Sequence, residues 1–151
     1  MKPVVQQDRT GCGIAGVAAL TGQSYSAVKR EAARLGIAAS DPTLWHDTGH
    51  VRRLLAHFRL QARKTEEKFT SWRSLPGCAL LAIKWHREKT GPAWHWVVFV
   101  RDAAGAYVLD PKKSLHTHRR TDFGRMKPKW FIRVRSKKAP VSLRVTWPAR
   151  V

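Results

Sequence analysis

The spacing of apolar residues changes about halfway along the chain, and this change restricts the fold more than any other feature. In the first sixty residues apolar side chains recur every three or four positions, which is typical of amphipathic helices. From residue 78 onward, short runs such as "CALLAIKW" and "WHWVVFV" are rich in the apolar and aromatic residues that favour strands. Helices that precede strands without alternation predict an α+β fold.

Three helices are expected in the first part of the chain. One begins near Cys12 and runs through "IAGVAAL", and the others cover "AVKREAARLG" and "HVRRLLAHF". Short polar side chains accept hydrogen bonds from the free N–H groups of a first turn. Ser24 or Ser26 is therefore expected to cap the second helix, and Asp47 or Thr48 the third.

The second part of the chain predicts an antiparallel sheet on which these N-terminal helices pack. Strands are expected over 78–85, 94–100, 106–110 and 129–135, with a loop at 87–93. Alternating apolar and polar residues at 141–147 indicate a further strand.

Charge is distributed unevenly along the chain. The formal net charge is +19, and residues 111–151 hold thirteen Lys and Arg against one Asp, a net charge of +12. A field of this sign attracts polyanions, so the basic C-terminal region is expected to contact nucleic acid or acidic proteins. We expect one folded domain over residues 1–136 and a basic extension over residues 137–151.

Several classes of protein are disfavoured. The longest apolar runs, such as "WVVFV", are too short to cross a bilayer, so no membrane span is expected. Two cysteines, Cys12 and Cys78, are too few for a disulfide framework and favour a reduced, cytoplasmic setting. The paired histidines at 46 and 50, and at 116 and 118, lack further ligands at zinc-site spacing. We therefore expect neither a metal nor another cofactor.

Cys12 lies between two glycines at the predicted start of a helix, where the free N–H groups stabilise a thiolate. Its own backbone N–H can serve as one oxyanion donor, and the amide of Gln6, six residues earlier, is a suitable second. Gly11 and Gly13 would let a substrate approach closely. A nucleophile is therefore one interpretation of Cys12, and a buried structural thiol is the other.

A nucleophilic thiol needs a histidine partner and a group that orients this histidine. His95 begins a predicted strand, and Asp110 ends the strand that follows it. A turn between the two strands would bring these side chains near each other. Trp94, beside His95, is a candidate wall of a substrate site, although packing in the core explains it equally well.

Four motifs occur in one order between Gln6 and Pro111: Gln-x5-Cys-Gly, then "LP" before "ALLAIKW", then "HWVVFV", then "YVLDP". This order resembles the papain-like cysteine peptidases, above all the bacteriocin-processing (double-glycine) peptidases and their stand-alone relatives. The resemblance implies a papain-like fold and a peptide or protein substrate. It also implies that Cys12 is the nucleophile, His95 the general base and acid, Asp110 the orienting group and Gln6 the oxyanion-hole donor.

Two other functions remain open from the sequence. The same residues could carry out deamidation or acyl transfer, because the shape of the site decides which nucleophile accepts the acyl group. Alternatively, the chain is a basic polyanion- or nucleic-acid-binding module on an inactive peptidase scaffold. Cys78 lies among apolar residues and is expected to be part of the core.

Overall fold

The computed structural model describes residues 1–136, which form a mixed α/β fold with three α-helices and a large antiparallel sheet. The helices are α1 (Cys12–Thr21), α2 (Tyr25–Arg34) and α3 (Gly49–His57), with short 3-10 helices η1 (Pro42–His46) and η2 (Phe123–Arg125). The strands are β1 (Leu60–Ala62), β2 (Glu67–Lys68), β3 (Cys78–Glu88), β4 (Gly91–Asp102), β5 (Gly105–Leu109), β6 (Arg119–Arg120) and β7 (Pro128–Ser136).

The strands pair in the order β1-β7-β3-β4-β5-β6, and β2 also pairs with β7. Every pair is antiparallel. The helices lead and the sheet follows, so the α+β prediction is confirmed for the described residues. The strand predicted at 141–147 and the basic extension 137–151 lie outside these residues.

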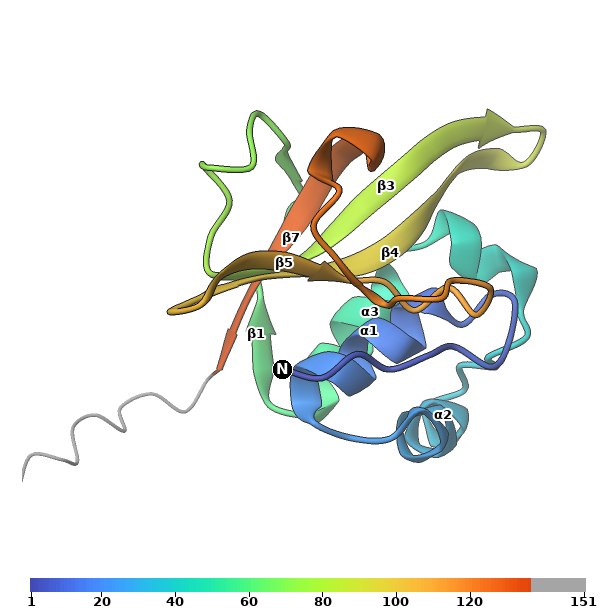
Figure 1. Cartoon of the computed structure of the whole chain (residues 1–151). Helices are drawn as coiled ribbons and strands as arrows, with labels where there is room; N and C mark the ends of the chain where they lie inside the picture. Colours follow the sequence, from blue (N-terminus) through green and yellow to red (C-terminus); the bar gives the residue numbers. More distant parts are fainter. Residues whose placement is uncertain (137–151) are drawn as a thin grey trace, which may run out of the picture.

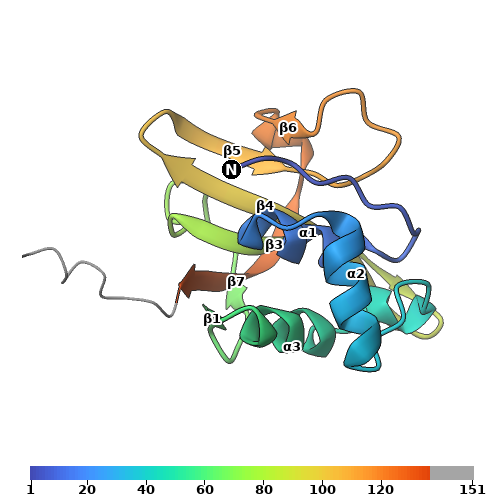
Figure 2. The ribbon, with the colours of Figure 1, turned by 90° about the horizontal axis from the view of Figure 1, so that it is seen from below.

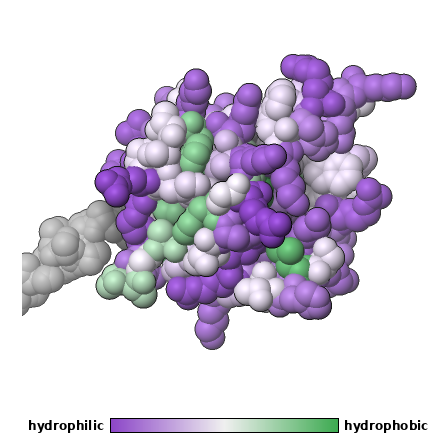
Figure 3. Space-filling model, turned by 45° about the horizontal axis from the view of Figure 1, so that its top comes forward, coloured by the Kyte–Doolittle hydropathy of each residue, from purple (hydrophilic) through white to green (hydrophobic). Residues whose placement is uncertain are grey.

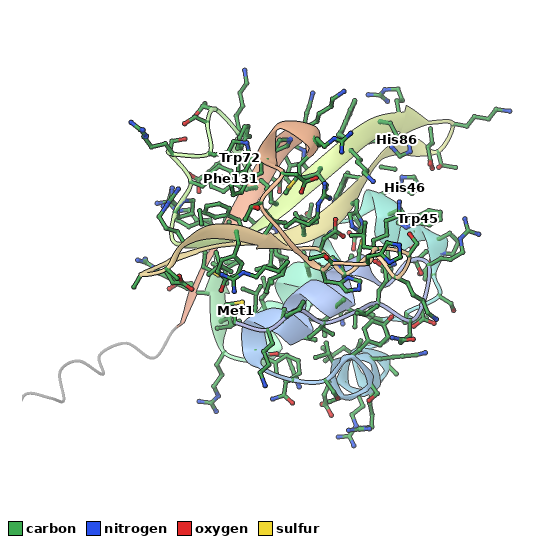
Figure 4. All side chains as sticks on the ribbon, in the orientation of Figure 1. Met1, Trp45, His46, Trp72, His86 and Phe131 are labelled. Carbon is green, nitrogen blue, oxygen red and sulfur yellow. The ribbon has the colours of Figure 1, made fainter. Side chains whose placement is uncertain are left out.

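The sheet separates two apolar clusters. α1 and α3 lie beneath one face, and α2 packs on the outer side of α1 (Figures 1 and 2). β4 alternates between the faces: Trp96 and Val98 join the core shared with the helices, and Val97 and Phe99 join the second cluster. The 63–77 connection and η2 cover that second face. Figure 4 shows one of its side chains, Trp72, near Phe131 of β7.

The ends of the helices follow the chemistry of their side chains. The Ser24 hydroxyl accepts the Ala27 N–H over 3.1 Å, which confirms it as the cap of α2. At α3 the capping side chain is Asp47, whose carboxylate accepts two N–H groups of the first turn. Within the described part of the chain no side chain caps α1, which begins directly at Cys12 after Gly11. The first turn of α1 therefore keeps its N–H groups free.

The loop predicted at 87–93 is wrong in extent. β3 and β4 continue toward each other as a hairpin with only Lys89 and Thr90 between them. Gly91 makes the turn possible, because its φ of 129° is strained for any side chain. Within residues 1–136, none of the helices combines the length and apolar character that a bilayer-spanning helix needs.

Candidate active site

One helix and two neighbouring strands bring Cys12, His95 and Asp110 together. Cys12 is the first residue of α1, His95 lies in the first half of β4, and Asp110 directly follows β5. The register of the two strands sets Val98 opposite Leu109. Asp110 comes one step past that pair and therefore lies diagonally across from His95.

Asp110 is a buried carboxylate with both oxygens occupied. Its Oδ1 lies 2.7 Å from Nε2 of His95 and accepts the Lys112 N–H over 3.0 Å. Its Oδ2 accepts from the Arg120 guanidinium over 2.8 Å. Burial raises the pKa of Asp110, but its hydrogen bonds and the charge on His95 outweigh burial and hold the pKa well below its usual range. Asp110 is thus a fixed negative charge that orients the His95 ring.

His95 interacts with both partners. Burial lowers the pKa of His95, but the hydrogen bonds and charge interactions with Asp110 and Cys12 outweigh burial and raise the pKa to about 9. Because Asp110 engages Nε2, Nδ1 is the ring nitrogen left for the Cys12 thiol. The raised pKa favours the protonated ring, and an imidazolium beside a sulfur atom is one of the arrangements that activate a thiol.

The two cysteines lie in different surroundings. Cys12 is 3% exposed, at the uncapped start of α1, where free N–H groups add partial positive charge. Its backbone N–H has no intrahelical acceptor and is available to an oxyanion. Cys78, at the start of β3, is partly buried, and burial raises its pKa to about 11. Burial therefore favours the protonated thiol at Cys78, which is the less reactive form.

Gln6 lies near the site, but its amide is engaged elsewhere. Its Nε2 donates to the carbonyls of Asp8 and Arg9 over 2.9 and 3.0 Å, and its buried Oε1 has no partner among the described residues. Reversing the amide would set Oε1 against two carbonyl oxygens, so hydrogen bonding favours this orientation. In this arrangement Gln6 has no N–H left for an oxyanion. Of the predicted pair of donors, the Cys12 N–H is the one that is free.

The residues predicted to contact substrate have other neighbours. A side chain at Gly11 would meet the Tyr25 hydroxyl, and one at Gly13 would lie 2.5 Å from Nε2 of His50. The space beside these glycines is therefore occupied by the protein's own side chains. Trp94 is buried against other tryptophans, with ring centroids 4.8 to 5.9 Å apart. None of the three lines the cleft beside His95.

This cleft has a volume of about 530 Å³. The N-terminal lead (6–9) lines one side, and His95, Lys84 of β3 and the segment 112–114 line the rest. The lead is attached here because the Gln6 N–H donates to the Pro111 carbonyl over 3.0 Å. Cys12 is not part of the lining, and His95 is the residue of the candidate triad that borders the cleft.

Sequence reasoning missed two residues of this region. Arg120 holds Asp110, and it reaches that carboxylate because β6 pairs with β5. Lys84 enters the cleft at an irregularity in the β3–β4 ladder. No spacing in the sequence marks either contact. Among residues 1–136, there is also no group of three His, Cys, Asp or Glu side chains arranged to hold a metal ion.

Comparison of the chain with protein-family models, curated proteins and solved structures finds no match. The geometry of the Cys12 region is therefore the basis for a functional assignment.

Proposed function

We propose that the chain is a papain-like cysteine peptidase that hydrolyses peptide or isopeptide bonds. One observation carries this proposal: His95 interacts with Cys12 and, through Nε2, with the buried carboxylate of Asp110 at 2.7 Å. A thiol, an imidazole and an orienting carboxylate in this order form a triad for nucleophilic catalysis. The position of Cys12 at the start of a helix, with His95 and Asp110 on the sheet, agrees with the fold that the sequence resemblance implies.

In the proposed reaction, the Cys12 thiolate attacks the carbonyl carbon of the scissile bond and forms a tetrahedral intermediate. Protonated His95 gives its proton to the leaving nitrogen, the C–N bond breaks, and an acyl thioester remains on Cys12. Water then attacks the thioester while His95 accepts one of its protons. The acid leaves and the Cys12–His95 ion pair is restored. Asp110 keeps the ring oriented and stabilises its positive charge throughout.

The oxyanion of each tetrahedral intermediate needs fixed donors. The Cys12 N–H at the start of α1 is one, and a single such donor typically contributes about 3 kcal/mol. Gln6 becomes a second donor only if its Nε2 releases the carbonyl of Asp8 or Arg9. This release would couple substrate binding to a movement of the N-terminal lead that lines the cleft.

A peptide library incubated with the protein and read by mass spectrometry tests the proposal. We expect cleavage products with the parent protein and Cys78→Ser, and a loss of about a thousandfold or more with Cys12→Ala or His95→Ala. Deamidation or acyl transfer passes through the same thioester but yields an uncleaved glutamate product or an amine adduct, which product masses distinguish. If turnover persists in Cys12→Ala, the proposed site is wrong.

A further inference from the structure

The cleft beside His95 has an excess of positive charge that the triad does not use. Among the described residues that line it, Asp8 is the only carboxylate, and Asp8 already accepts from Tyr25 over 2.6 Å and pairs with Lys29 at 3.2 Å. Among residues 1–136, no carboxylate lies within ion-pair distance of the four cations that line the cleft, which are Arg9, Lys84, Lys112 and Lys113.

The position of Lys84 depends on a distortion of the sheet. Ile83 of β3 pairs with His95 of β4, and His86 of β3 pairs with Ala93 of β4. Between these two pairs, β3 has two residues, Lys84 and the one after it, while β4 has only one. This β-bulge holds Lys84 at a φ of 55°, in the left-handed region that side chains other than Gly rarely adopt. A bulge at this point turns the Lys84 side chain into the cleft and toward the candidate catalytic histidine.

Lys84 and Lys112 come from different elements and approach each other in the cleft. Burial lowers the pKa of Lys84 and the neighbouring Lys112 ammonium lowers it further, while the Asp110 carboxylate opposes them without reversing the direction. Two like charges held this close repel each other, and an anion placed between them would relieve this repulsion. Most of the face seen in Figure 3 is hydrophilic. The cleft differs from an ordinary charged surface because its cations lie close together, beside the candidate triad.

We propose that this cleft binds a carboxylate of the peptide substrate, held by Lys84 and Lys112, next to the bond that Cys12 attacks. This inference rests on the proposed function, because it takes the cleft as the substrate groove of the Cys12–His95 site. The substrate class is an acidic peptide, in which the carboxylate belongs either to a Glu or Asp side chain or to the C-terminus.

The lining favours a peptide over nucleic acid. Single-stranded nucleic acid is held by cations together with aromatic rings on which the bases stack. His95, the triad histidine, is the one ring-bearing side chain among the described residues that line the cleft. A compact carboxylate needs only donors and positive charge, which Lys84 and Lys112 supply.

Binding of short labelled peptides, measured by fluorescence anisotropy at low salt, tests the inference. The full chain carries Cys12→Ala, so no probe is consumed. The first probe has an internal Glu pair and blocked ends, the second has Gln in place of Glu and a free C-terminal carboxylate, and the third has Gln and blocked ends. Lys84→Asn suits the bulge because Asn tolerates a left-handed backbone. Lys112→Gln is the second variant, and Lys64→Gln, at an exposed position outside the cleft lining, is the matched control.

A unit charge about 6 Å away in water changes binding about threefold, and two such charges about tenfold. We therefore expect Lys84→Asn and Lys112→Gln each to weaken a carboxylate probe about threefold, the double variant about tenfold, and Lys64→Gln to change nothing. The probe that responds, the first or the second, identifies the source of the carboxylate. Equal losses in Lys64→Gln, or equal binding of the neutral third probe, would overturn the inference. So would an oligonucleotide that binds through the same lysines when neither carboxylate probe does.

This readout is independent of the chemistry at Cys12. Absence of Cys12-dependent turnover in the library experiment refutes the proposed function, whatever the peptides bind. If the protein shows Cys12-dependent turnover but carboxylate probes bind equally well without Lys84 and Lys112, only the inference of an acidic substrate is refuted.

Discussion

Replacing Asp110 by Asn tests how the site keeps His95 protonated. The Asn side chain has nearly the same shape, and its carbonyl oxygen can still accept a hydrogen bond from Nε2 of His95. The change removes the negative charge that lies 2.7 Å from the ring. The Asn NH2 group then faces the Arg120 guanidinium in place of Oδ2, where two donors meet. Arg120 keeps a second carboxylate partner in Asp122 at 2.7 Å, so we expect the fold to survive with reduced stability.

The size of the effect follows from the pKa of His95. A pKa of about 9, compared with an ordinary 6.5, corresponds to about 3 kcal/mol in favour of the protonated ring. Burial opposes this protonation, while Asp110 and Cys12 favour it. When the Asp110 charge is removed, only Cys12 is left to oppose the effect of burial, which lowers the pKa of His95. We therefore expect this pKa to fall by at least one unit.

NMR titration of the His95 ring protons, in the parent and in Asp110→Asn, measures this shift directly. A raised pKa of His95 stabilises the folded state fully below about pH 6.5, and this contribution is lost as the pH rises through about 9. The unfolding free energy of the parent protein should therefore also decline between these two pH values. The decline should be smaller in the variant. A His95 that titrates at the same pH in both proteins would refute the role given to Asp110.

Three further predictions concern the stability of the fold. Gly13→Ala sets a methyl group 2.5 Å from Nε2 of His50. It should lower the free energy of unfolding, measured in urea, by about 1 to 3 kcal/mol. Gly124→Ala, which has open space around it, should leave this free energy nearly unchanged. Ser24→Ala removes the cap of α2 and should lower the same free energy by about 1 kcal/mol. The lowered pKa of Asp110 contributes stability above about pH 4 that is lost as the pH falls, so acid unfolding followed by circular dichroism should be less steep in Asp110→Asn.

The sequence predicted the elements that depend on local patterning. The helices and the main strands follow from apolar periodicity, and the Ser24 cap follows from side-chain chemistry. The approach of His95 and Asp110 was also predictable, because a hairpin with a short turn fixes which residues lie across from each other. These features need only the contacts of neighbouring elements.

Features that depend on distant contacts were not predictable. The bulge at Lys84 arises from the pairing of β3 with β4, and the contact of Arg120 with Asp110 depends on where β6 joins the sheet. The space around Gly11 was assigned to substrate, but Tyr25 of α2 fills it. The amide of Gln6 was assigned to an oxyanion, and its bonds to two loop carbonyls appear only in three dimensions.

The most direct test of the central claim is the rate at which iodoacetamide alkylates Cys12 as a function of pH. The measurement uses Cys78→Ser as the background and His95→Ala as the comparison. A thiol with the ordinary pKa of about 8.5 loses about a hundredfold in thiolate between pH 8 and pH 6. If His95 and the start of α1 stabilise the thiolate, the rate at pH 6 should stay within about tenfold of the rate at pH 8, and His95→Ala should abolish this reactivity. A Cys12 that follows the ordinary profile, or does not react at all, would contradict the account.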